Sequence, residues 1–145
     1  MKPEQFIREY GVDKAREVVE GAPGFPVFGY CTLTGNYIFK RSNATAYYHN
    51  ETNSWSKDYA IELILLEDLK RLVELLDIVR VIGPIEYTRS VVTNAPVNAI
   101  GYDTMYEGYF GEETKHYYEN LRTFTIDQIK DAVAVHESIY GGGHV

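Results

Sequence analysis

The chain has 145 residues, of which 45% are hydrophobic and 24% charged, which is enough apolar content for a buried core and excludes a disordered chain. With 14 basic and 21 acidic residues the formal charge is −7. The acidic excess is present in both halves, so no basic cluster is available for non-specific nucleic-acid binding.

Cys31 is the only cysteine, which excludes an internal disulfide and a cysteine metal cluster and fits a reducing compartment. The N-terminus has no apolar core of a secretory signal, and no run approaches the ~18 apolar residues of a membrane span. We therefore expect a protein of the cytoplasm that does not enter membranes.

The first segment, Pro3–Glu20, carries apolar residues at helical spacing, and Gly11 is expected to divide this helix. Aromatic and β-branched residues then predict strands at Val27–Leu33 and Tyr37–Lys40, joined by a turn at Gly35, and a third strand at Ala44–His49. Together these strands would form an antiparallel meander.

The next segment, Asn50–Lys57, is polar apart from Trp55 and predicts a loop. Tyr59–Leu66 is apolar and fits either a buried strand or the start of a helix. Asp68–Val81 has the clearest amphipathic pattern, and a second long helix is expected at Ile126–Ile139.

Two stretches of the chain, Gly11–Tyr30 and Gly83–Tyr102, resemble each other in the order of their Gly, Arg, Val-Val, Ala-Pro and Gly-Tyr elements. The similarity continues from Tyr37 to Tyr109 and from the Tyr47-Tyr48 pair to the Tyr117-Tyr118 pair. Because the order of the matched residues never changes, we interpret the chain as a tandem duplication.

The predicted fold class is therefore α+β, with copies at residues 1–77 and 78–145. Each copy would contain a short helix, an antiparallel β-meander and a longer amphipathic helix. A three-stranded sheet has one face to bury, so the copies are expected to pack as one pseudo-twofold unit, through their helices or as a six-stranded sheet. A single α/β domain with accidental similarities is the alternative.

No arrangement of residues in the sequence predicts catalysis, a metal site or a cofactor. The four histidines, at positions 49, 116, 136 and 144, have no metal-ligand spacing. Cys31 lies in a strand pattern, where a small buried thiol is the usual explanation. A phosphate-binding GxxxxGK[ST] loop is absent, and we expect a protein that is not an enzyme.

The second predicted hairpin and its exit combine carboxylates with aromatic residues. Such a surface can dock on a basic partner, although a solvated hairpin would have the same composition. The paired tyrosines and the single tryptophan fit either sheet packing or an aromatic contact surface. The candidate partner-binding residues are Asp103, Tyr106, Glu107, Tyr109, Glu112, Glu113, Trp55, Tyr48 and Tyr118.

The opening Phe6-Ile7, Tyr10-Gly11 and Lys14-Ala15, followed by the helix that starts with Asp68-Leu69-Lys70, resembles small accessory proteins of tailed bacteriophages and prophages. The resemblance covers the first copy, about half of the chain. Its motifs look structural, so the resemblance implies a phage or prophage origin more than a mechanism, and it assigns no site residue.

From the resemblance and the acidic composition, we expect a protein that binds and inhibits or modulates a host protein machine in the bacterial cytoplasm, such as a CRISPR or restriction defence system. The expected partner has a basic surface, and the chain itself would be a monomer with internal symmetry or a homodimer. The alternative is a module that sequesters a small nucleotide.

Overall fold

The computed structural model describes residues 1–22, 29–32, 35–40, 47–49, 54–56, 63–118 and 122–141. The contacts of the chain define two compact units, Met1–Val73 and Glu74–Val145. The boundary falls inside helix α3 (Leu66–Ile82), a few residues before the division that the repeat predicts.

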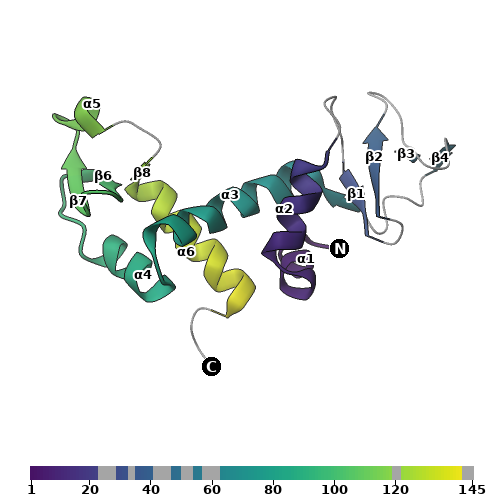
Figure 1. The fold of residues 1–145 in the computed structure, drawn as a ribbon, viewed down its shortest axis with the longest axis horizontal. Coiled ribbons are helices and arrows are strands. Elements are labelled where there is room, and N and C mark those ends of the chain that lie inside the picture. The colour runs from purple at the N-terminus through teal and green to yellow at the C-terminus, as the bar shows by residue number, and fades with distance from the viewer. Residues whose placement is uncertain are drawn as a thin grey trace. The chain divides into compact units, whose positions relative to one another are not determined.

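Two short helices open the first unit, α1 (Pro3–Tyr10) and α2 (Val12–Glu20) (Figure 1). Pro3 suits the first turn of a helix, where its missing N–H needs no partner. Gly11 separates the helices with a φ of 92°, a value that glycine adopts without strain, and its N–H donates to the carbonyl of Ile7 at 2.8 Å. The predicted break at Gly11 is confirmed.

The sheet of the first unit has five antiparallel strands in the order β4-β3-β2-β1-β5. Their bounds are β1 (Gly29–Cys31), β2 (Asn36–Lys40), β3 (Tyr47–His49), β4 (Ser54–Ser56) and β5 (Leu63–Leu65). Strands at the three predicted places are confirmed. The predicted loop around Trp55 is wrong at residues 54–56, because that segment pairs with β3 as β4.

The long helix α3 follows β5 directly, so the ambiguous apolar segment supplies both a strand and the start of a helix. Glu67 and Asp68 lie in the first turn, where negative charge stabilises the helix dipole. Leu69 and Leu72 are buried in the first half of α3, and Ile78 and Val79 in the second. The helix therefore contributes apolar side chains to both units.

The second unit contains α4 (Ile85–Thr93), β6 (Ala99–Asp103), β7 (Gly108–Gly111), α5 (Lys115–Tyr118), β8 (Thr123–Thr125) and α6 (Ile126–Tyr140). Its sheet is antiparallel in the order β7-β6-β8. Thr125 and Gln128 form a capping box at the start of α6, and Gly141 ends the helix with a φ of 84°.

The core of the second unit lies between the sheet and the helices α3, α4 and α6. Tyr102 is its central strand residue, and partly buried residues such as Val92, Tyr109 and Phe124 pack around it. The buried members of this core are Ile78, Val79, Val91, Tyr102, Ile126, Ile129 and Ala132.

The predicted meander of the second copy is wrong in one element. Tyr117 and Tyr118 lie in helix α5, although their counterparts Tyr47 and Tyr48 lie in a strand. The third strand is β8, which pairs with β6 and makes the first strand of the hairpin the central one. The described strands form a five-stranded sheet in the first unit and a three-stranded sheet in the second, and the six-stranded sheet, one of the two expected packings, is not among them.

Three neighbouring strands have the same order along the chain in both sheets, β2-β1-β5 in the first unit and β7-β6-β8 in the second. Gly29 pairs with Leu65 and Gly101 pairs with Thr125 at the same relative position of each ladder. Residues 32–35 and residues 104–107 connect the paired strands of the two hairpins, so the connections have equal length.

A candidate protein-binding loop

The loop of residues 104–107 closes the hairpin of β6 and β7, between the paired residues Asp103 and Gly108. Asp103 is only 1% exposed. Its Oδ1 accepts hydrogen bonds from the backbone N–H groups of Met105 at 2.8 Å and Tyr106 at 3.1 Å. This Asx-type turn fixes the backbone of the loop from inside.

A second set of bonds attaches the same loop to the segment before β8. The backbone N–H of Thr104 donates to the carbonyl oxygen of Arg122 at 3.1 Å, and the Thr104 hydroxyl donates to that oxygen at 2.8 Å. Glu107 completes the turn with a φ of 55°, the left-handed conformation that a non-glycine residue adopts only when its surroundings favour it.

The side chains at the tip of this braced loop point to solvent. Met105 is 63% exposed and Tyr106 is 72% exposed, and Glu107 is exposed beside them. The Arg122 guanidinium lies 5.8 Å from the centre of the Tyr106 ring, within cation–π range. The Arg122 guanidinium also donates to the Met105 sulfur. The tip therefore presents a thioether, an aromatic ring and one charge of each sign. We call Met105, Tyr106, Glu107 and Arg122 the loop tip.

Asp103 and Tyr109 were both predicted to belong to the contact surface. Asp103 is buried, so the prediction of an exposed acid is wrong at this position, and the carboxylate organises the loop instead. The Tyr109 hydroxyl donates to the carbonyl of Val91 at 2.6 Å, and its ring packs edge-on against Tyr102 at 5.2 Å. Burial raises the pKa of Tyr109, as expected for a phenol held in the core.

The remaining predicted carboxylates lie at the other end of β7. Glu112 forms an ion pair with Lys115 at 2.9 Å, and Glu113 is exposed next to it. The four residues of β7 span about 13 Å. The acidic run of the sequence is thus divided between the loop tip and this second group, which borders a shallow hollow of about 360 Å³ with Asn98 and Thr114.

For the predicted aromatic contact residues outside this hairpin, the structure describes the backbone position only. Tyr48 of β3 is directly opposite Trp55 of β4 and also opposite Phe39 of β2. Tyr118 is the last residue of α5. The side chains of these residues fall outside the described part of the chain.

Three residues of the loop region did not stand out in the sequence. Thr104 and Met105 lie within the acidic run but carry no charge themselves, and Arg122 lies outside it. The three meet because β6 lies between β7 and β8. The one available signal is the Asp103 to Gly108 spacing at the end of a strand pattern, because Asp and Gly are typical turn residues.

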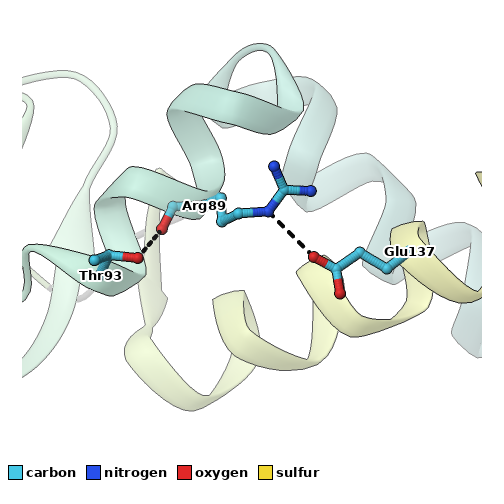
Figure 2. Close-up of polar contacts among 3 residues, drawn as sticks. All are labelled: Arg89, Thr93 and Glu137. Atoms are coloured by element: carbon cyan, nitrogen blue, oxygen red, sulfur yellow. Dashed lines mark hydrogen bonds and ion pairs between the residues drawn. The ribbon is translucent and has the colours of Figure 1, made fainter. Parts of the chain in front are cut away.

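A polar contact of a different kind joins α4 and α6. The Arg89 guanidinium donates to the Glu137 carboxylate at 3.1 Å, while the Thr93 hydroxyl donates to the Arg89 carbonyl at 3.0 Å (Figure 2). His136 lies next to this pair with its Nδ1 buried, and its ring is 4.7 Å from that of Tyr140. Burial and the positive charge of Arg89 lower the pKa of His136.

Within the described segments, no group of three or more His, Cys, Asp or Glu side chains is placed to hold a metal ion. Cys31 is 4% exposed and lies in β1. No helix among the described residues is long and apolar enough to cross a membrane.

Fold and site together define an α+β protein of two compact units, with an exposed, braced loop on the second. Comparisons with protein-family models, curated proteins and solved structures gave no match.

Proposed function

We propose that the protein is a non-enzymatic phage or prophage accessory protein that binds a host protein through the loop tip and so inhibits or modulates it. The observation that carries this proposal is that the loop is fixed by the Asp103 carboxylate and the Arg122 carbonyl while Met105 and Tyr106 stay largely exposed. Met, Tyr and Arg are enriched at the centres of protein interfaces.

The bracing of the loop supports binding for a thermodynamic reason. Ordering a flexible loop on association reduces affinity, and a loop that is already fixed avoids this loss. The hydrogen bonds to Met105 N, Tyr106 N and Arg122 O hold the backbone before any partner arrives. Tyr106 keeps a large flat surface with few rotatable bonds, which is favourable for contact at low entropic cost.

The charge of the chain favours a basic partner. With a formal charge of −7 the protein attracts cationic surfaces over distances of about a Debye length, ~8–10 Å at physiological salt. Glu107 places one negative charge at the loop tip itself. A nucleic-acid-binding or nucleotide-dependent defence complex in the host cytoplasm has basic surfaces of this kind, and such a complex is our proposed target class.

The proposal is tested by affinity capture from host lysate with four immobilised baits. We expect wild-type protein to retain a host protein that Met105→Ala and Tyr106→Ala retain at least tenfold less. Val97→Ala is the matched control, because Val97 is fully exposed and lies outside the loop tip. Equal melting temperatures of the four baits would show that the fold is unchanged. Recovery of the same proteins by all baits, or of none, would contradict the proposal.

We further infer that the two units arose by duplication of one α-β unit. Several paired features support this inference besides strand order. Gly11 and Gly83 both adopt positive φ after a helix, and their N–H groups donate to Ile7 at 2.8 Å and Val79 at 2.9 Å. The hairpin loops both end in a left-handed residue, with φ of 74° in the first and 55° in the second. The position-by-position agreement extends to the repeated sequence motifs.

A further inference from the structure

The second unit has a hollow of about 360 Å³ at its sheet, and no residue of the loop tip lines it. Its lining comes from β6, β7 and β8 and from the first residues of α5 and α6. A volume of this size is at the lower end of the range for small-molecule sites. The lining residues are Ile100, Phe110, Lys115, Thr123, Phe124, Thr125 and Gln128.

The apolar part of the lining is fixed by packing. Phe110 is only 8% exposed, and its ring lies so close to the backbone of Gly101 that a Cβ at that position would overlap it. Phe124 packs against the core of the unit, and Ile100 is half-buried. Side chains held in this way offer a firm surface to the apolar part of a ligand.

The polar part of the lining offers hydrogen-bond donors. In the capping box of α6, Thr125 Oγ1 accepts from the Gln128 N–H at 3.0 Å, and Gln128 Oε1 accepts from the Thr125 N–H at 2.9 Å. The box engages both side-chain oxygens as acceptors and uses neither the Gln128 Nε2 hydrogens nor the Thr125 hydroxyl hydrogen. Lys115 adds an ammonium group, which pairs with Glu112 at 2.9 Å and carries three donors in all.

The hydroxyl groups of β8 have no counterpart in the equivalent strand of the first unit. Leu65 of β5 and Thr125 of β8 both pair with a glycine of the neighbouring strand, and Leu63 and Thr123 lie two residues before them. The first sheet thus has leucine where the second has threonine. The strand order that both sheets share does not require hydroxyl groups at these positions.

We propose that this hollow binds a small aromatic carboxylate, with the ring against the apolar part of the lining and the carboxylate on the donors of Lys115 and Gln128. A set of donors with its own acceptors engaged is complementary to an acceptor group, and a carboxylate forms the stronger, charge-assisted bonds. The volume corresponds to about a dozen non-hydrogen atoms at the ~30 Å³ that one water molecule occupies in the liquid. One ring with a short acidic side chain has this size.

The affinity is limited by the size and the exposure of the site. Thr125 and Gln128 are exposed, so water competes for their donors. A ligand of about a dozen atoms in such a site is expected to bind with a Kd of roughly 0.1–1 mM. The inference goes beyond the proposed host-binding function and concerns other residues and another class of ligand, so either can fail without the other.

The site is tested by nuclear magnetic resonance titration of the full chain with two probes of the same shape. Cinnamate carries the carboxylate, and cinnamamide has a neutral amide in its place. We expect cinnamate to shift the amide signals of Lys115 and of residues 123–128 in a saturable way. Cinnamamide is expected to bind at least about fivefold more weakly, because it lacks the charge-assisted hydrogen bonds.

Gln128→Glu changes the donors and keeps the fold. Glutamate serves as well as glutamine in a capping box, so the melting temperature should not fall. The new carboxylate replaces the Nε2 donors and should weaken cinnamate binding at least about tenfold. Lys130→Gln is the matched control, because it changes the net charge by the same unit at a residue outside the lining, and its Kd should stay within about twofold of the wild type.

The outcomes decide the proposal. Saturable shifts at these residues that need the carboxylate and are lost in Gln128→Glu, with Lys130→Gln unchanged, support it. The absence of saturable shifts up to about 5 mM cinnamate would overturn it. Equal binding of both probes, unchanged binding by Gln128→Glu, or shifts confined to other segments would each overturn it as well.

Discussion

The hydroxyl group of Tyr109 donates a hydrogen bond to the backbone carbonyl of Val91 at 2.6 Å. In the first unit, Tyr37 donates to Val18 at 2.6 Å. Both tyrosines come from the second strand of a hairpin, and both carbonyls belong to the helix that precedes that hairpin. A strand is thus tied to a helix in the same way twice.

Removing either hydroxyl should destabilise its own unit. Tyr109→Phe leaves the Val91 carbonyl without this partner, and Tyr37→Phe does the same to Val18. We expect each change to lower the free energy of unfolding by about 0.5–1.5 kcal/mol, the usual net contribution of one hydrogen bond. Urea unfolding of the two variants measures this loss. Exposed Tyr106→Phe is the control, and a loss as large in this variant would contradict the assignment.

Asp103 should be needed for the loop more than for the sheet. Asp103→Ala removes the acceptor for the N–H groups of Met105 and Tyr106, a loss similar to that of a helix cap, about 0.5–2 kcal/mol. Asp103→Asn retains an acceptor oxygen and should lose less. Amide hydrogen exchange at Met105 and Tyr106 should accelerate in the alanine variant. Glu113→Ala, which removes an exposed carboxylate, should leave both measurements unchanged within about 0.5 kcal/mol.

Glu107 and Gly35 occupy the same place in the two hairpin loops and should respond oppositely to substitution. Left-handed backbone costs a non-glycine residue about 1–2 kcal/mol, part of which is offset by the larger entropy of glycine in the unfolded chain. Glu107→Gly is therefore expected to stabilise by about 0.5–1 kcal/mol, and Gly35→Ala to destabilise by a similar amount.

For Gly35 the space around an added Cβ is not limiting, since its nearest neighbour would be the Tyr30 hydroxyl at 3.5 Å. The measured change would then report backbone conformation alone. Thermal unfolding of both variants is the measurement. A stabilised Gly35→Ala, or a destabilised Glu107→Gly, would show that the loops differ in conformation from the structure.

The sequence predicts the helices well because their signals are long. α3 and α6 carry apolar stripes over several turns. Gly11 separates α1 from α2, as a glycine between two helical patterns is expected to do. Short elements behave differently. β4 and β8 have three residues each, as do the predicted strands β1 and β3, but β4 lies in a polar segment where a residue such as Trp55 indicates a loop equally well.

The similarity of Tyr47-Tyr48 to Tyr117-Tyr118 was misleading for a related reason. Two matching residues do not determine a strand, and Thr114 and Lys115 start a turn of helix there instead. The candidate site shows the same limit. In the sequence, Asp103 lies in a segment with the composition of a solvated turn. Its carboxylate is buried because β6 pairs with β7 on one side and with β8 on the other.

His136 should make the stability of the second unit sensitive to acid. Its pKa is lowered by burial and by Arg89, while Glu137 and Glu86 act in the opposite direction, and Tyr140 packs against the ring. Because the folded protein favours the neutral imidazole, the stabilisation is complete above the unfolded-state pKa of about 6.5. This stabilisation decreases as the pH falls from the unfolded-state pKa through the lower folded-state pKa. Over that interval the unfolded chain binds a proton at His136 that the folded protein does not bind.

The matched variants are His136→Gln, which cannot titrate, and His116→Gln, which removes an exposed imidazole. We expect the wild type and His116→Gln to lose stability between about pH 7 and pH 5, and His136→Gln to lose distinctly less. Urea unfolding at a series of pH values gives the comparison, and nuclear magnetic resonance titration of the imidazole gives the direction of the pKa shift directly. Parallel pH curves for the wild type and His136→Gln would show that His136 titrates alike in both states, which the buried Nδ1 beside the Arg89–Glu137 pair argues against.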